Sequence, residues 1–302
     1  MPREYWRPAG AVVAALAATL SLGLGACNSS SGPANPSLTA AQADSVGEVV
    51  AMDADGEIDG STTTGGGTSY QAQIRPPSLG LDLATVAYQC TVTRTPTSPV
   101  DTDHDGVPDS VLFTFTNCVL SLPLESDSLS GAIAIVDPTP SVADHAAKQV
   151  FVTLRHARLI TATGKHTAET VNGARSGSRD STKLALADLN LQTVYLFGDG
   201  STATHVRNWA STFTADVAGS IKPDTRLPSG TWNISGMSSW TRGANSWSLA
   251  VTTSPALHYN ATCTMAPRFD AGTLVAVVTQ GAMTSTLTVV FTACGAYSVT
   301  KS

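Results

Sequence analysis

From about residue 79 onward the sequence consists of β-type runs separated by short turn signals, and this pattern limits the fold more than any other feature. Runs rich in Val, Thr, Ile and aromatic residues favour strands, and the segments 198–200, 242–245 and 280–283 are short enough to close hairpins. Because no helical segment intervenes, consecutive strands should pair antiparallel as a meander. The expected strands are residues 83–95, 110–120, 131–136, 149–163, 182–197, 202–217, 231–241, 246–253, 256–264, 272–279 and 284–293.

Several of these runs exceed ten residues, whereas an ordinary strand has five or six. Long antiparallel strands twist and coil. The expected fold class is therefore all-β, with a single large, strongly twisted antiparallel sheet that is open and curved or forms a barrel or half-barrel. The polar stretch 164–180, which contains Lys165, His166, Arg175 and Arg179, is expected to be a weakly basic loop.

Composition excludes other classes of protein. Ser and Thr account for 72 of the 302 residues, and their short hydroxyl side chains compete with the helix backbone, which argues against a coiled coil or helical bundle. The 17 Lys and Arg face 23 Asp and Glu and form no basic block, so nucleic acid is not an expected partner. A hydrophobic share of 42% is sufficient for a packed core.

One helix is expected, at residues 39–55. Thr39 and Gln42 have the spacing of a capping box, and Val46, Val49 and Val50 share a helical face. Residues 27–38 are polar and rich in Ser, Pro and Gly, which is typical of a flexible tether. The chain is thus divided into residues 1–26, the tether 27–38, and a β domain 39–302 that starts with the helix.

The N-terminus carries a sorting signal. Arg3 and Arg7 precede an apolar run of 14 residues at 9–22, too short for a membrane span but suitable for a signal-peptide core. The run ends in the sequence LGAC at 24–27, which resembles the lipobox of bacterial lipoproteins. The resemblance implies that signal peptidase II removes residues 1–26 and that Cys27 is acylated, so that N-terminal acyl chains bind the protein to a membrane. The alternative is an ordinary secretory signal with an incidental cysteine.

Asn28 follows the lipobox cysteine. In enteric bacteria an Asp at this position retains lipoproteins at the inner membrane, so the resemblance implies the cell envelope and, under that rule, the outer membrane as the destination.

Four further cysteines predict two structural disulfides, because export permits oxidation and their spacing does not suit zinc. Cys90 and Cys118 lie symmetrically about residue 104 and should face each other across a hairpin. Cys263 and Cys294 then form the second pair.

The segment 101–109, DTDHDGVPD, resembles the DxDxDG start of EF-hand-type and thrombospondin-type calcium loops. Alternate carboxylates can converge on one hard cation while the glycine turns the chain. The expected ligands are Asp101, Asp103, Asp105, Asp109 and the carbonyl of Val107. Leu112 stands where an EF-hand has a bidentate Glu, so an EF-hand is excluded. The alternative is an acidic, solvated hairpin loop.

No residue is assigned to catalysis, since the sequence contains no HExxH, GxSxG or P-loop motif. His156 and His205 fall on expected strands, where satisfied core side chains are the favoured interpretation.

A turn at 242–245 pairs Trp240 with Trp247, while Trp232 shares their face and Trp209 precedes them. Packing explains these tryptophans best, and a wall for a sugar or apolar ligand is the alternative.

The sequence thus predicts a lipid-anchored envelope protein with a non-catalytic binding or structural β domain. Its partner would be an apolar, sugar or envelope-protein ligand. One alternative is a carrier of lipid or another apolar molecule in a cavity of the curved sheet. A second is a hydrolase whose catalytic residues are dispersed along the sequence.

Overall fold

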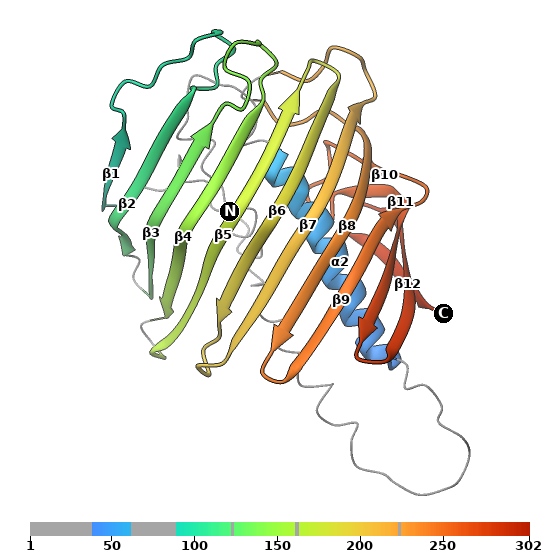
Figure 1. The fold of residues 1–302 in the computed structure, drawn as a ribbon. Helices are drawn as coiled ribbons and strands as arrows, with labels where there is room; N and C mark the ends of the chain where they lie inside the picture. Colours follow the sequence, from blue (N-terminus) through green and yellow to red (C-terminus); the bar gives the residue numbers. More distant parts are fainter. Residues whose placement is uncertain (1–37, 62–88, 122–123, 161–162, 223–224) are drawn as a thin grey trace, which may run out of the picture.

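The computed structural model describes residues 38–61, 89–121, 124–160, 163–222 and 225–302. One helix and thirteen strands lie in these ranges (Figure 1). They are α2 (Ala40–Ser61), β1 (Gln89–Thr95), β2 (Ser110–Ser121), β3 (Glu125–Val136), β4 (Ala147–Ile160), β5 (Lys165–Arg179), β6 (Lys183–Leu196), β7 (Thr202–Ala215), β8 (Gly230–Arg242), β9 (Asn245–Thr253), β10 (Leu257–Tyr259), β11 (Phe269–Gln280), β12 (Met283–Ala293) and β13 (Ala296–Lys301).

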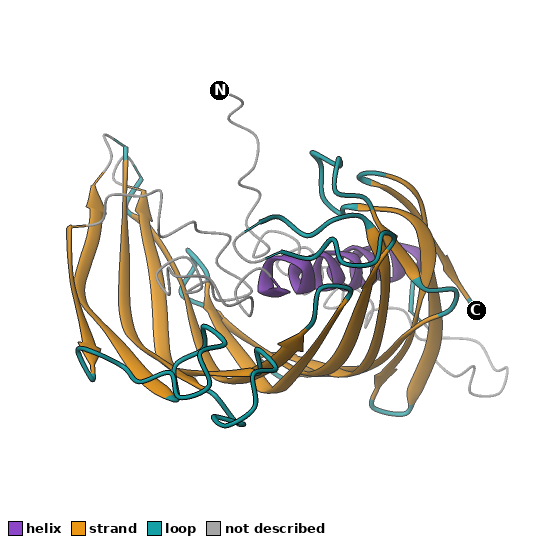
Figure 2. Ribbon diagram, turned by 90° about the horizontal axis from the view of Figure 1, so that it is seen from above, coloured by secondary structure: helices purple, strands orange, loops and turns teal. Residues whose placement is uncertain are grey.

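All thirteen strands belong to one antiparallel sheet, as the sequence predicts. Strands β1 to β8 pair in sequence order, β9 and the short β10 both pair with β8 and β11, and β12 and β13 follow. Within the described residues β1 and β13 have one neighbour each, so the sheet is an open meander. Figure 2 shows that the sheet is strongly curved and that α2 lies on its concave side.

A row of glycines and bulges crosses the sheet and explains its curvature. Gly131, Gly173 and Gly236 have φ values of 108°, 109° and 148°. A Cβ atom at each would lie 2.2–2.3 Å from a carbonyl oxygen of a neighbouring strand. Thr153 and Asn190, at bulges in the same row, also have positive φ. Bulges and glycine kinks bend strands and increase their twist, so this row curves the sheet about α2.

Four strands differ from the sequence-based expectation, and one of them, β3, begins at Glu125 and not at residue 131. The stretch 164–180, expected to be a loop, contains β5, and a register shift against β6 falls between Asn172 and Ala174. Residues 296–301 form the unexpected strand β13, and the expected strand 256–264 is reduced to β10. Strand β5 has few apolar side chains, and it is held by ladders to β4 and β6 on both sides, each with one register shift.

Helix α2 begins with the predicted capping box. Gln42 N donates to Thr39 Oγ1 at 3.3 Å, and Thr39 N donates to Gln42 Oε1 at 2.7 Å. The helix runs to Ser61, past its expected end at residue 55. Because the helix continues to Ser61, Asp55 lies before its last turn, and Arg268, which directly precedes β11, donates from Nη2 to Asp55 Oδ2 at 2.9 Å.

The buried apolar side chains form two clusters. The larger unites α2 with residues of β6–β12. The smaller, which we call the N-terminal apolar cluster, contains no residue of α2. Its members are Val107, Val111, Phe113, Phe115, Cys118, Leu129, Ile133, Ile135, Ala147, Phe151, Leu154, Val171 and Leu191.

No described helix combines the length and the hydropathy that a membrane-spanning helix needs.

Candidate functional sites

The acidic loop between β1 and β2 brings three of its carboxylates together. Asp101, Asp103 and Asp105 each place one oxygen within 4.8 Å of the others. Positive φ values at His104 (60°) and Gly106 (92°) turn the chain between them. Oxygens that bind calcium lie about 2.3–2.6 Å from the ion, so three oxygens at this separation can share one ion.

Asp101 and Asp103 each use one carboxylate oxygen to hold the loop. Gly106 N donates to Asp101 Oδ2 at 3.0 Å, and Asp105 N donates to Asp103 Oδ1 at 3.1 Å. The other oxygens, Asp101 Oδ1 and Asp103 Oδ2, are shielded from solvent and accept no hydrogen bond from a described residue. Leaving a shielded charged oxygen without a partner is unfavourable by more than about 1–3 kcal/mol, which a bound cation would offset.

Asp105 connects the acidic loop to the segment between β3 and β4. Its Oδ1 accepts from Val107 N at 2.7 Å, and its Oδ2 accepts from His145 N at 2.5 Å. The Asp105 side chain is fully buried, and burial raises its pKa even though these two hydrogen bonds act in the opposite direction. The contact with His145 spans two loops and therefore could not be recognised from the loop motif.

Asp109 stands outside the group of three. Its Oδ1 accepts from Thr102 N at 2.9 Å and its Oδ2 from Thr102 Oγ1 at 2.7 Å, and these bonds lower the pKa of Asp109. Val107 is buried in the N-terminal apolar cluster. Of the five expected ligands the structure thus groups three, while Asp109 closes the loop.

The cysteines lie as the sequence predicts where they are described. Cys263 and Cys294 form a disulfide with a Cα–Cα distance of 5.5 Å, next to the β12–β13 turn. Cys118 is also disulfide-bonded. The Cys90 side chain lies outside the described residues; on either side of it Gln89 pairs with Val119 and Thr91 with Thr116, so a register shift falls between these two pairs, close to Cys118.

A buried ion cluster joins α2 to the middle of the concave face. We define it as Glu57 of α2, Arg175 of β5, Asp188 of β6 and Arg207 of β7. Arg175 Nε donates to Asp188 Oδ1 and its Nη2 to Glu57 Oε1, both at 2.6 Å. Arg207 Nη2 lies 2.8 Å from Asp188 Oδ2 and 3.3 Å from Glu57 Oε1. The expectation that Arg175 belongs to a surface loop is wrong, since this side chain is completely buried.

The charges of this cluster balance: two guanidinium groups face two carboxylates. Burial opposes ionisation of Asp188, but Arg175 and Arg207 lower its pKa below the ordinary value. Ser211 Oγ adds a hydrogen bond to Glu57 Oε2 at 3.1 Å. No sequence motif marks the cluster, because its members come from four elements.

Asp53 and His205 lie beside the cluster and extend it. His205 Nε2 lies 3.3 Å from Asp53 Oδ2, and the imidazole stacks on Trp240 with ring centroids 4.0 Å apart. Burial raises the pKa of Asp53 to about 7, against the effect of Arg207. Burial, together with Arg207, holds the pKa of His205 well below its usual value.

His156 lies between two carboxylates on neighbouring strands. Its Nε2 is 3.5 Å from Asp127 Oδ1 in β3, and its Nδ1 is 3.7 Å from Glu169 Oε1 in β5. Burial alone would lower the pKa of His156, but the two carboxylates raise it to about 9. The strand placement expected for His156 and His205 is confirmed.

The four tryptophans are core residues in this structure. Trp240 pairs with Trp247 as predicted, and all four are buried, with exposed fractions between 0% for Trp232 and 6% for Trp247. Trp209 and Trp232 belong to the larger apolar cluster with α2. They form no open platform for a ligand.

No serine hydroxyl of the described residues is hydrogen-bonded to a histidine ring; Ser211 donates to Glu57 instead.

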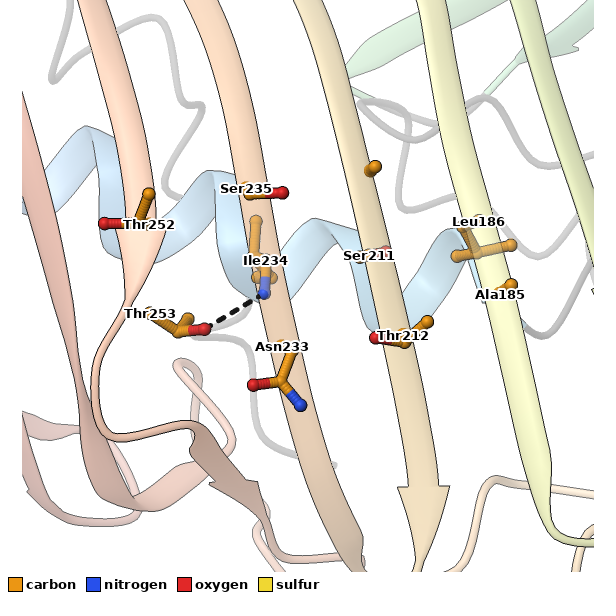
Figure 3. A pocket seen from close by; sticks show the side chains of 10 residues that line it. Ala185, Leu186, Ser211, Thr212, Asn233, Ile234, Ser235, Thr252 and Thr253 are labelled. Atoms are coloured by element: carbon orange, nitrogen blue, oxygen red, sulfur yellow. Dashed lines mark hydrogen bonds between the residues drawn. The ribbon is translucent and has the colours of Figure 1, made fainter.

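A hollow on the face of the sheet away from α2 (Figure 3) is lined mostly by small and hydroxyl-bearing residues of β6–β9. Its residues are Ala185, Leu186, Ala210, Ser211, Thr212, Asn233, Ile234, Ser235, Thr252 and Thr253. None of them can act as an acid or a base near neutral pH.

No protein-family model, no curated protein and no solved structure matches this chain.

Proposed function

We propose that this protein is a lipid-anchored lipoprotein of the cell envelope, destined for the outer membrane, with a non-catalytic structural or binding β domain. The observation that supports the non-catalytic role is the occupation of the concave face. Helix α2 packs there through the larger apolar cluster and the buried ion cluster. The polar groups at the centre of the sheet therefore hold a helix and are not open to a substrate.

The anchor rests on the lipobox, whose Cys27 lies outside the described residues. Replacing Cys27 by Ala should abolish incorporation of a clickable fatty acid and release the mature domain or leave it unprocessed. Ser29→Ala, two residues away, is the matched control and should label like the wild type. Equal labelling of Cys27→Ala and wild type would refute the lipoprotein proposal.

We propose further that the acidic loop binds one calcium ion through Asp101, Asp103 and Asp105. The two shielded carboxylate oxygens without a hydrogen-bond donor support this. The affinity should be modest, on the order of 10⁻⁴–10⁻³ M, since the loop supplies few protein ligands. The ion would act on stability, because the loop contacts the N-terminal apolar cluster through Val107 and the β3–β4 segment through Asp105.

A carrier of an apolar ligand is the second candidate, favoured by the N-terminal apolar cluster. Its strand residues lie in β2–β6 and point to the same side of the sheet as Arg175. Cross-strand pairing shows this, because Val111 pairs with Ile135, Ile135 with Gln149, and Gln149 with Arg175. Arg175 contacts α2, so these side chains lie on the concave face, where they are buried although no residue of α2 belongs to their cluster. Native mass spectrometry of the protein extracted from envelopes should then detect a co-purifying lipid. A Phe113→Ser, Phe151→Ser variant should lose it, whereas Met237→Ser, on the convex face, should keep it.

A further inference from the structure

Strand β13 has one open edge. Among the described strands it pairs with β12 alone. Ser302, which follows β13, donates from N to the carbonyl oxygen of Thr286 at 2.9 Å, and Thr286 N donates to the carbonyl oxygen of Ser302 at 3.0 Å. In an antiparallel pair such reciprocal bonds recur at every second residue. The even-numbered residues of β13 therefore bond to β12, whereas the backbone N–H and C=O groups of Tyr297 and Val299 point away from it.

Helix α2 supports this edge from the concave side. A Cβ atom at Gly47 would lie 2.5 Å from Cγ2 of Val299, so the helix passes directly over the strand. Lys301 Nζ donates to the carbonyl oxygen of Leu38, at the start of the helix, at 2.6 Å. At the other edge of the described sheet, by contrast, residues 91–95 of β1 are all exposed. Strand β13 is thus held in place before any partner arrives, which lowers the ordering cost of adding a strand.

The sequence of β13 contains none of the devices that usually block an open edge. Natural edge strands are protected by prolines, by bulges or by charged side chains along their length. Strand β13 has no proline, and its register with β12 is regular from Tyr297 to Lys301. Lys301 is its only charged residue and stands at its end. The edge can therefore accept a further strand by β-augmentation.

The charges around the edge suit a second copy of this chain. Burial raises the pKa of Tyr297, and so do the carboxylates of Glu48 and Asp44, which therefore lie near the first half of β13. Lys301 carries a positive charge at the opposite end of the same strand. When two copies of β13 meet antiparallel, the lysine of each copy approaches the two carboxylates of the other. Opposite charges placed in this way favour pairing with the chain's own copy.

We propose that two copies of this chain pair antiparallel through β13 and form a twofold dimer with one continuous sheet, with Ser298 of each copy at the axis. The four outward backbone groups of each copy then bond to the other, because Tyr297 faces the partner's Val299. These two side chains form an aromatic–β-branched pair on the concave face, and the partner's Lys301 is the diagonal neighbour of Tyr297. The dimer depends neither on the lipid anchor nor on calcium.

The twofold arrangement also closes on itself. A pairing between β13 of one copy and β1 of the next would be head-to-tail and would leave two edges open for further copies, so it would produce long assemblies. The isologous β13–β13 contact stops at two copies.

Cysteine cross-linking of the purified full-length chain in detergent tests the register. Ser298→Cys places two cysteines opposite each other, about 4.5 Å apart between Cα atoms, which a disulfide can span. Mild oxidation should then give a covalent dimer on a non-reducing gel. Thr300→Cys is the matched control, since it is exposed on the same strand. It faces the partner's Ala296 and lies about 13 Å along the strands from its own counterpart, so it should remain monomeric. Equal cross-linking of the two variants, or none from Ser298→Cys, would overturn the proposal.

Sedimentation velocity of the same protein tests the backbone bonds and the charges. Val299→Pro removes an N–H that points away from β12, so it should abolish the dimer without breaking that ladder. Lys301→Glu should weaken association by roughly 2- to 30-fold, because two symmetric charge pairs become repulsive. Adding Glu48→Lys to that variant should restore much of the association, which a merely misfolded variant would not do. Unchanged dimers in the Val299→Pro and Lys301→Glu variants, a monomeric wild type, or long assemblies would each refute the twofold β13 dimer.

Discussion

The buried ion cluster and the acidic loop both gather carboxylates, but only the cluster receives its cations from the chain itself. In the cluster, Glu57 and Asp188 face Arg175 and Arg207. In the loop, Asp101 and Asp103 keep shielded oxygens that no described donor reaches. A buried charge must be neutralised by something. The charges of the cluster are therefore balanced within the chain, although Arg175 Nη1 has no hydrogen-bond acceptor among the described residues, whereas the loop would be completed by an ion from solution.

The largest loss of stability should follow the removal of one cation from the buried ion cluster. Arg175→Met leaves Glu57 and Asp188 buried with Arg207 alone, and the free energy of unfolding should fall by about 3–5 kcal/mol. Arg158→Met is the matched control, since its pair with Glu125 is half-buried at a rim and should contribute about 0–1 kcal/mol. Urea unfolding measures both. Similar losses in the two variants would show that the cluster is no more important than a surface pair.

His156, which lies between two carboxylates, is a pH-dependent example of buried charges that are balanced within the chain. Its pKa is about 9 in the folded chain and near 6.5 when unfolded, so its stabilising effect is complete below pH 6.5 and lost as the pH rises to 9. At about 1.4 kcal/mol per pKa unit, the loss is up to about 3 kcal/mol. Urea unfolding between pH 6 and 9.5 checks this. His156→Gln should show a flatter profile over this window, and identical profiles would contradict the assignment.

Calcium should have the smallest effect of the three. With a dissociation constant of about 10⁻⁴–10⁻³ M, 10 mM calcium should stabilise the folded chain by about 1–3 kcal/mol relative to EDTA. In a domain of this size that corresponds to a rise of a few degrees in Tm. Asp103→Asn combined with Asp105→Asn should abolish the rise, and magnesium should not reproduce it. Identical wild-type melting curves in calcium and EDTA would mean that the loop is only an acidic turn.

Much of the sheet could be predicted from local patterns. Turns of fixed length determine which residues face each other, so the Trp240–Trp247 pair followed from the turn at 242–245, and it is confirmed. Pairing Cys90 with Cys118 left Cys263 and Cys294 as the second predicted disulfide, which is also confirmed. These features depend on residues close in sequence or on a choice among few pairings.

Strand β5 and the end of α2 could not be predicted in the same way. The β5 segment reads as a loop because its apolar residues are few, but β4 and β6 satisfy its backbone on both sides. Helix α2 continues past its expected end at residue 55, and two arginines far away in sequence, Arg207 and Arg268, pair with acidic residues in its second half. In both cases tertiary contacts outweigh the local propensity.

The sequence by itself determined the all-β class, the meander order, the capping box of α2 and the grouping of three aspartates in one loop. Each arises from short-range chemistry: side-chain alternation, turn residues and alternate carboxylates. Only the tertiary structure decided that α2 lies on the concave face and that Arg175 and Asp188 meet Glu57 there. Glu57 is far from Arg175 in sequence, and burial makes their pairing necessary only once the sheet has curved around the helix.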